Sequence, residues 1–300
     1  MEIINRKYVN ILGIDLTGTP RESLLRLIQS RIAKFRQSEA NLSLKEKLFI
    51  VTLNPEQLIL AQKDSEFKKI INSSDIKIPD GVGLLAADYF LKQPNYKNKI
   101  IRFLFLLFQG IFVGIAILLK RKWLEKDFQI IRGREFFIEL IKLANKKGWR
   151  VYFLGGKKNV SETVQKKFEQ SYKKIRIKSS SGPILNNFGL TVGDEDRVEE
   201  KRVVEEINNF RPHLLFVAYG APKQEKWLYR WLSNLKIGVG MVVGGTFDYL
   251  AGTAKLPPKW MSDAGLEWLW RVVQEPERII RIITAIIIFP LKIFIYKLQK

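Results

Sequence analysis

An apolar run ends in a polar cluster at residues 213–227, which read HLLFVAYGAPKQEKW. Gly220 closes the apolar run, and Lys223, Gln224 and Glu225 follow it where a helix is expected to begin. Open α/β sheets bind ligands outside the carboxyl ends of their strands, and the free amides and dipole of a helix N-terminus favour an anion there. We therefore predict that this cluster faces an anionic ligand such as a diphosphate. A capped helix start with solvated charges is the alternative interpretation.

Hydroxyl, amide and carboxyl groups follow two other predicted strand ends. Thr52 and Asn54 lie in VTLNPEQ, where a hydroxyl and an amide could hold a polar ligand. Asp80 lies in IKIPDGVG at a strand-to-helix turn, and Gly81 beside it lets the backbone approach a ligand closely. Asp80 could cap the helix or remove a proton from an acceptor hydroxyl, and both interpretations stay open.

Two pairs of glycines also follow apolar runs. Gly155 and Gly156 end VYFLGG, and Gly244 and Gly245 end MVVGGTFD. Each pair is a weak phosphate-loop signal, but two pairs in one α/β chain favour a nucleotide ligand, although neither G-x-G-x-x-G nor a P-loop is present. Residues 194–196 match the D-x-D pattern of metal-dependent sugar transferases, yet they precede a charged helix, so we interpret them as helix-capping residues and expect no metal site.

Composition limits the classes of function. The chain of 300 residues carries 51 Lys and Arg against 30 Asp and Glu, a formal net charge of +21, which favours polyanions or an anionic membrane surface. No nucleic-acid recognition motif accompanies this charge, so we do not expect nucleic acid as a partner. The chain has no cysteine, which excludes disulfides and Cys nucleophiles, and we interpret the single histidine, His213, as structural. We expect a cytosolic catalytic domain.

Apolar runs alternate with segments of helical spacing, a pattern typical of a mostly parallel sheet wrapped by helices. We predict an α/β fold with a doubly wound, Rossmann-like sheet over residues 1–256, interrupted by an apolar helical insertion at 99–123. The predicted strands cover residues 9–16, 48–53, 150–154, 175–179, 214–219 and 239–243. The predicted helices cover residues 21–36, 56–71, 81–91, 135–146, 161–172, 197–210 and 224–235.

The insertion contains IIRFLFLLFQGIFVGIAILL at 100–119, which is long enough to cross a bilayer. A single crossing would divide the predicted sheet between the two sides of the membrane, and basic residues flank both ends of the segment. We therefore favour a re-entrant or in-plane membrane element that turns near Gly110 and keeps both flanks cytosolic. An ordinary buried helix or a subunit contact is the alternative.

Residues 257–300 form a second segment outside the predicted body. From Pro276 onward the sequence is rich in isoleucine and phenylalanine, with only a narrow basic stripe when drawn as a helix. Pro290 should kink or end that helix, which favours a tail lying at the membrane interface over a straight transmembrane span. We predict an appendage that contacts the membrane.

Six blocks of sequence, in this order, resemble the WecG/TagA/CpsF bacterial glycosyltransferases, glycosyltransferase family 26. They are TLNPEQ at 52–57, PDGVG at 79–83, FLGG at 153–156, GAPKQEKW at 220–227, VGGTFDYLAGT at 243–253 and GLEWLWRVVQEPERIIR at 265–281. The resemblance covers most of the chain outside the apolar insertion.

The resemblance implies an inverting, metal-independent transferase on the cytosolic face of the cell membrane, with no cofactor. Such enzymes move a sugar, typically N-acetylmannosamine from its UDP donor, onto a polyprenyl-diphosphate-linked N-acetylglucosamine. It implies Asp80 as the general base. It also implies that Arg271, Arg278 and Arg281 of the appendage reach over the pocket, complete the active site and stabilise the leaving diphosphate.

Further site residues carried over from the resemblance are Thr52, Asn54 and Gln224, which would place donor or acceptor, and Asp248, which would contact uridine or ribose. The chain departs from the family pattern at residues 255–260, KLPPKW, and in the expanded apolar insertion. These departures make the reaction class firmer than the identities of the sugars.

Two other classes of function stay open beside the transferase. A non-enzymatic membrane lipid-binding scaffold would use both apolar segments but has no use for Asp80. A nucleotide-dependent oxidoreductase would suit the fold, but the dinucleotide fingerprint is missing. Assembly into a homo-oligomer is also left open.

Overall fold

A sheet of six parallel strands forms the centre of the computed structural model, which describes residues 8–37, 46–119, 129–263, 267–274, 276 and 279–299. The strand order across the sheet is β4-β3-β8-β7-β5-β6. The strands are β3 (Leu48–Leu53), β4 (Ile76–Pro79), β5 (Arg150–Gly155), β6 (Arg176–Ser180), β7 (Leu214–Ala218) and β8 (Val239–Val242).

The inner strands are mostly apolar, apart from Arg150 at the start of β5 and Thr52 near the end of β3, as expected where helices cover both faces of a sheet. Along β5, Tyr152 and Leu154 join one buried cluster, whereas Val151 and Phe153 join the other. This alternation places a separate hydrophobic core on each face. The doubly wound α/β fold predicted from the sequence is therefore confirmed.

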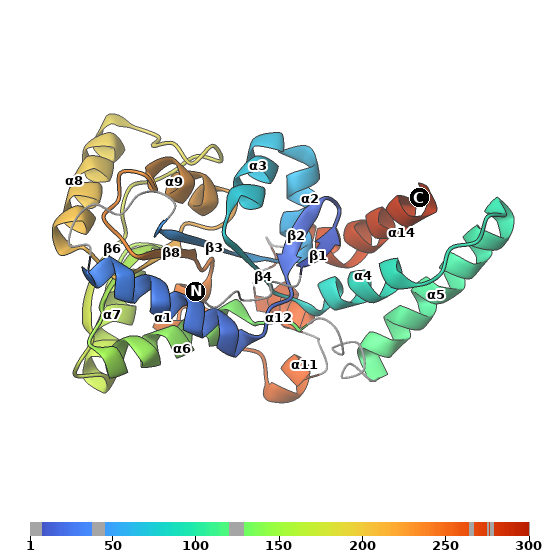
Figure 1. Cartoon of the computed structure of the whole chain (residues 1–300), viewed down its shortest axis with the longest axis horizontal. Coiled ribbons are helices and arrows are strands. Elements are labelled where there is room, and N and C mark those ends of the chain that lie inside the picture. Colours follow the sequence, from blue (N-terminus) through green and yellow to red (C-terminus); the bar gives the residue numbers. More distant parts are fainter. Residues whose placement is uncertain are drawn as a thin grey trace.

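Nine helices of the described chain accompany the strands in the body (Figure 1). One face of the sheet packs against α2 (Pro55–Lys63), α3 (Ser65–Ser73), α4 (Val82–Lys92), α8 (Asp194–Phe210) and α9 (Lys223–Trp231). The other face packs against α1 (Arg21–Gln37), α6 (Gly133–Lys147), α7 (Val160–Ser171) and α10 (Thr246–Ala251).

Two local predictions were wrong. The predicted strand at residues 9–16 is a hairpin of β1 (Tyr8–Ile11) and β2 (Ile14–Thr17), because Leu12 and Gly13 turn with positive φ. The predicted helix at 56–71 breaks into α2 and α3 at Asp64, whose side chain accepts the Phe67 N–H and so starts a new helix. The predicted strand ranges were also incomplete: they omitted β4, whose run IKIP is only four residues long, although a strand end before Asp80 was expected.

The apolar insertion forms a single helix, α5 (Lys99–Leu119). It continues through Gly110, so the predicted re-entrant hairpin with a turn near Gly110 is wrong. The helix packs against α4, and 17% of its apolar window, Lys99–Ile117, is buried. Its mean hydropathy of 2.3 marks it as one of two helices in the described chain that are long and apolar enough to cross a membrane.

The C-terminal segment folds into α11 (Lys259–Asp263), α12 (Glu267–Gln274), α13 (Ile279–Ile283), the π-helix η4 (Thr284–Ile288) and α14 (Phe289–Gln299). Pro290 does not end the helix, contrary to one of the predicted outcomes. The π turn precedes it, and the wider i→i+5 bonding, seen in the Phe289 N–H to Thr284 carbonyl bond, accommodates the proline within the run. Ile279–Gln299 is the second candidate span, with 11% of its window buried.

Helices α4, α5 and α14 form a lobe at one end of the molecule (Figure 1). Arg102 of α5 donates to the Leu298 carbonyl of α14 at 3.1 Å. Lys297 of α14 in turn donates to the Phe90 and Gln93 carbonyls at the end of α4. These bonds reach carbonyls at the C-terminal ends of α4 and α14, where helix carbonyls run short of intrahelical donors. The two apolar segments thus lie together on the body.

Candidate functional site

The carboxyl ends of all six parallel strands open into one pocket of about 710 Å³. Its walls come from residues at or after the ends of β3, β4, β5, β6, β7 and β8, together with the start of α6 and one residue of α13. Of the residues predicted from sequence, the pocket gathers Thr52, Asn54, Asp80, Gly156, Gln224, Gly244, Gly245, Asp248 and Arg281. Segments that are far apart in the chain therefore meet where a ligand was expected.

Asp80 lies at the junction of β4 and the start of α6. Its Oδ2 accepts the Gly133 N–H at 3.2 Å, and Gly133 is the first residue of α6. Helix α4, by contrast, begins at Gly81 without a side-chain cap. Asp80 thus faces the positive end of a helix from another part of the chain, which favours a negative charge on its carboxyl group.

Gly133 permits this approach because it has no side chain. A Cβ at Gly133 would lie 3.1 Å from Thr52 Cγ2 and 3.3 Å from Asp80 Oδ2. Thr52 itself donates from Oγ1 to the Val242 carbonyl at 3.3 Å. The three residues are therefore in close contact at the wall of the pocket.

Asn54 caps α2 while it borders the pocket. Its Oδ1 accepts the Gln57 N–H at 2.9 Å, and Gln57 Oε1 accepts the Asn54 N–H at 3.0 Å. This reciprocal pair is a capping box. Substrate placement by Asn54 stays a prediction, and its Oδ1 already has a structural partner.

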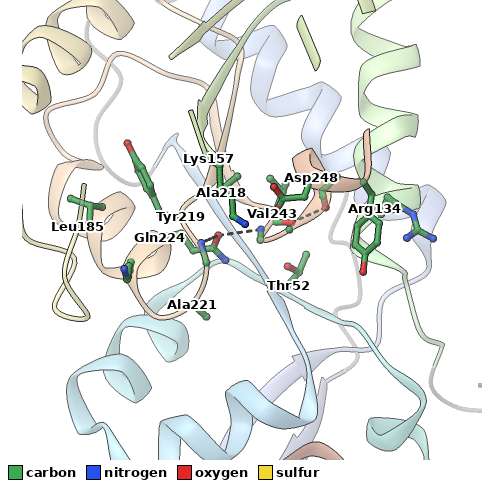
Figure 2. Close-up of a pocket in the computed structure, with 18 of the residues that line it drawn as sticks. Thr52, Arg134, Lys157, Leu185, Ala218, Tyr219, Ala221, Gln224, Val243 and Asp248 are labelled. Carbon is green, nitrogen blue, oxygen red and sulfur yellow. Dashed lines mark hydrogen bonds between the residues drawn. The ribbon is translucent and has the colours of Figure 1, made fainter. Parts of the chain in front are cut away.

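Gln224 is buried, with 1% of its surface exposed, and joins two turns. Its Oε1 accepts the Gly220 N–H at 3.2 Å and the Gly244 N–H at 3.1 Å (Figure 2). The first glycine follows β7 and the second follows β8. Gln224 thus holds the floor of the pocket together, and a direct contact with a donor stays a prediction.

The predicted glycines differ in what they do. Gly156, Gly244 and Gly245 line the pocket, whereas Gly155 does not. Gly155 has φ +98°, and a Cβ there would lie 2.9 Å from the Ala218 carbonyl carbon. It therefore allows the ends of β5 and β7 to approach each other beneath the pocket.

Basic side chains outnumber acidic ones around the pocket. The basic residues are Arg132, Arg134, Lys157, Lys158, Lys223 and Arg281, and the acidic ones are Glu56, Asp80 and Asp248. Sequence reasoning missed the first four. Only their positions in the sequence could have identified them, because KK follows the glycine pair of β5 and RGR stands at the start of α6. The balance of charge suits a ligand with several negative charges.

The opposite wall is formed by α10. Asp248 lies in its first turn, and its carbonyl accepts the Thr253 hydroxyl at 3.0 Å. The guanidinium of Arg134 lies 5.4 Å from the centre of the Tyr249 ring. This wall therefore offers an aromatic ring, a cation and a carboxylate to the pocket, as a base and ribose would require.

Of the three predicted arginines, Arg281 reaches the pocket. Its Nε lies 2.6 Å from Glu56 Oε1 in an ion pair. Arg271 belongs to α12, but the description does not extend to its side chain, and Arg278 lies outside the described residues.

His213 and the 194–196 cluster lie outside the residues that line the pocket. His213 Nδ1 accepts the Arg150 N–H at 2.7 Å. Burial, and then the charges of Arg150 and Arg36, lower the pKa of His213 to about 4. Asp196 Oδ2 accepts the Gly193 N–H at 3.3 Å at the start of α8. The structural interpretation of His213 and the capping interpretation of the acidic cluster are both confirmed.

Comparison with known proteins gives a family and similar relatives. The family model described as "Glycosyl transferase WecG/TagA/CpsF family" matches residues 9–109 and 106–300. Similar relatives include the N-acetylglucosaminyldiphosphoundecaprenol N-acetyl-beta-D-mannosaminyltransferases of Staphylococcus aureus strains MW2 and MRSA252. Each is 28% identical over 296 residues, which cover 99% of this chain and 94% of the relative.

Proposed function

The chain belongs to the WecG/TagA/CpsF family of glycosyl transferases, and from this premise we propose that it transfers N-acetylmannosamine from UDP-N-acetylmannosamine to a polyprenyl-diphosphate-linked N-acetylglucosamine. As a glycosyltransferase it is neither a lipid-binding scaffold nor an oxidoreductase. The sugars and the lipid-linked acceptor are taken from the names of the relatives. UDP as the carrier is what the resemblance to the family implies, and the basic residues that line the pocket support it.

Asp80 is the general base of the proposed reaction. The acceptor hydroxyl loses its proton to the Asp80 carboxylate while its oxygen attacks the anomeric carbon of the donor sugar. The bond from that carbon to the diphosphate oxygen breaks, and UDP leaves with the electron pair. Attack from the face opposite the diphosphate inverts the configuration at the anomeric carbon. Support for this role comes from the place of Asp80 at the pocket wall, beside Thr52 and the N-terminus of α6.

The leaving diphosphate is stabilised by protein cations in this proposal, without a bound metal. Lys157 and Lys158 follow β5, Lys223 begins α9, and Arg281 approaches from α13. Cationic side chains and helix N-termini stabilise charge that develops on a leaving oxygen. The meeting of these cations with Asp80 in one pocket is the observation that carries the proposed function.

We further propose that the enzyme works on the cytoplasmic face of the cell membrane. The outward side of α5 presents an unbroken apolar surface that includes Ile100, Leu104, Phe108, Ile111 and Ile115. The exposed isoleucines of α13 and η4 add to it. An acceptor with a polyprenyl chain stays in the bilayer, so docking on the same surface raises the effective concentration of enzyme and acceptor.

The test is UDP release from UDP-N-acetylmannosamine in the presence of a polyprenyl-diphosphate-linked N-acetylglucosamine. Asp80→Asn should lower kcat by about a hundredfold or more, because it removes the base but keeps the shape of the side chain. UDP affinity, measured by calorimetry, should stay within a few-fold of that of the wild type. The matched control is Asp194→Asn, an exposed carboxylate at the start of α8, which should keep full activity.

Equal rates for Asp80→Asn and the wild type would remove Asp80 as the base. Product analysis by NMR tests the stereochemistry, since the proposal requires the anomeric configuration of the donor to be inverted. Unchanged turnover in EDTA is expected, and turnover that depends on an added divalent cation would contradict the metal-independent mechanism.

A further inference from the structure

A carboxyl group is completely buried behind the floor of the pocket. Glu225, the residue after Gln224 in α9, has no exposed surface. Its Oε1 accepts the Gln224 Nε2–H at 2.9 Å and the Gln57 Nε2–H at 3.2 Å. Its Oε2 has no hydrogen-bond partner among the described residues. A buried carboxyl group that serves two amides requires an explanation, because burial without full pairing costs free energy.

The two glutamines that donate to Glu225 each use their other end at the pocket. Gln224 Oε1 accepts the N–H groups of Gly220 and Gly244, and Gln57 Oε1 accepts the Asn54 N–H. An amide side chain has an acceptor at one end and donors at the other, so its orientation is fixed by the partners at both ends. The acceptor on Glu225 requires both amides to turn their nitrogens inward and their oxygens toward the turns.

A flipped Gln224 would disrupt the floor of the pocket. Its Nε2 would then face the N–H groups of Gly220 and Gly244, donor against donor, and both turns would lose their link. We propose that Glu225 is a positioning residue that orients Gln224 and Gln57 and so fixes the turns after β3, β7 and β8 in the shape that binds the diphosphate of the donor. The inference rests on the proposed function, because it assigns these turns to the donor.

The surroundings of Glu225 fit an orienting role better than a charge-pairing role. The adjacent Lys226 pairs with Asp64 and Glu66, each at 2.8 Å, and so is committed elsewhere. Burial raises the pKa of Glu225 to about 7, and the bonds from Gln224 and Gln57 oppose that rise. Protonated or ionised, the carboxyl group can accept both amides on Oε1, so orientation does not depend on its charge.

The experiment measures UDP binding by calorimetry on the full chain in mild detergent. Glu225→Leu removes the acceptor and should weaken UDP binding about tenfold, the effect expected from loss of one or two hydrogen bonds. Glu225→Gln keeps an oxygen acceptor in nearly the same shape and should bind UDP within about twofold of the wild type. The matched control is Gln62→Leu, which removes another amide of α2: its Nε2 donates to the Leu12 and Leu58 carbonyls, and its Oε1 accepts from the Lys68 ammonium.

A double variant separates orientation from general damage. Gln224→Leu should weaken UDP binding by itself, and adding Glu225→Leu should cause little further loss, because the second residue acts through the first. Additive losses would overturn the inference, as would a Glu225→Leu protein that binds UDP as the wild type does. Should Glu225→Leu fail to fold, Glu225→Gln still tests the inference. A loss of UDP affinity greater than about tenfold in Glu225→Gln would show that the charge is required and not the acceptor.

The same titration distinguishes this inference from the proposed function. A wild-type protein that does not bind UDP contradicts the proposed donor, whatever Glu225 does. A wild-type protein that binds UDP, with unchanged binding in Glu225→Leu, contradicts only the positioning role.

Discussion

Substitution of His213 should change how stability responds to acid. The Nδ1 of His213 accepts the Arg150 N–H, and the side chain is 3% exposed, so protonation would break the bond and bury a charge beside an arginine. The pKa is 6.5 for an ordinary histidine and about 4 in the folded chain. Between these values the unfolded chain binds more protons, so the stabilisation is complete above the unfolded pKa and is lost as the pH falls.

The expected loss follows from these two pKa values. Between about pH 7.5 and about pH 5, linkage gives a decrease of about 2 kcal/mol in the free energy of unfolding from His213 alone. Glu225 works in the opposite direction over much of this range, because its folded pKa is raised, to about 7. The wild type alone would therefore show little net change from this pair, and a comparison between two proteins is required.

The comparison is between the wild type and His213→Gln, unfolded in urea and followed by tryptophan fluorescence at both pH values. Glu225 and all other shared groups are the same in both proteins, so their contributions cancel in the difference between the two free energies of unfolding. This difference should shrink by about 2 kcal/mol on going to the lower pH. A difference that is the same at both pH values would refute the conclusion that His213 is buried in its neutral form.

Two further predictions concern the floor of the pocket and the apolar lobe. Gly155→Ala should destabilise the chain by about 2 kcal/mol or more, because φ is +98° and the Cβ would collide with the backbone of Ala218. Gly220 has φ +76°, but a Cβ there would meet nothing within 4 Å, so Gly220→Ala should lower the free energy of unfolding by only about 1 kcal/mol. Equal thermal unfolding midpoints for the two variants would contradict the conclusion that the Cβ at residue 155 collides with the backbone. Replacing both Phe108 and Ile111 of α5 by serine should reduce sedimentation with anionic liposomes at least several-fold, because both side chains are more than half exposed and apolar. Val198→Ser, at an exposed apolar position of α8, is the matched control, and an equal reduction there would argue against a specific docking face.

The strands at the centre of the sheet could be predicted because burial on both faces requires long apolar runs, as in residues 214–218 and 239–242. For β4 only the strand end before Asp80 could be predicted, since a run of four residues that ends in Pro79 is too short to define a strand range. The break between α2 and α3 depends on Asp64 acting as a cap, although the apolar spacing continues across it. Local patterns thus located the elements better than they located the ends of the elements.

The residues of the site could likewise be predicted only in part from the sequence. Thr52, Asp80 and Gln224 stood out because each lies at or shortly after the end of an apolar run, and parallel strands bring such positions to one edge. Lys157, Lys158, Arg132 and Arg134 did not stand out in a chain with 51 Lys and Arg. Lys157 and Lys158 follow the glycine pair at the end of β5, whereas Arg132 and Arg134 reach the pocket through the contact of the start of α6 with the end of β4, between residues about 50 positions apart, which no local pattern encodes.

The pairing of α5 with α14 has a consequence for the newly made chain. Helix α5 leaves the ribosome about 160 residues before α13 and α14, so at about 5–20 residues per second it waits on the order of ten to thirty seconds for its partner. During that interval the apolar helix lacks its contacts with α14, although it can already pack against α4. Early contact with lipid would shield it, and the nascent chain would then reach the membrane before its catalytic sheet is complete.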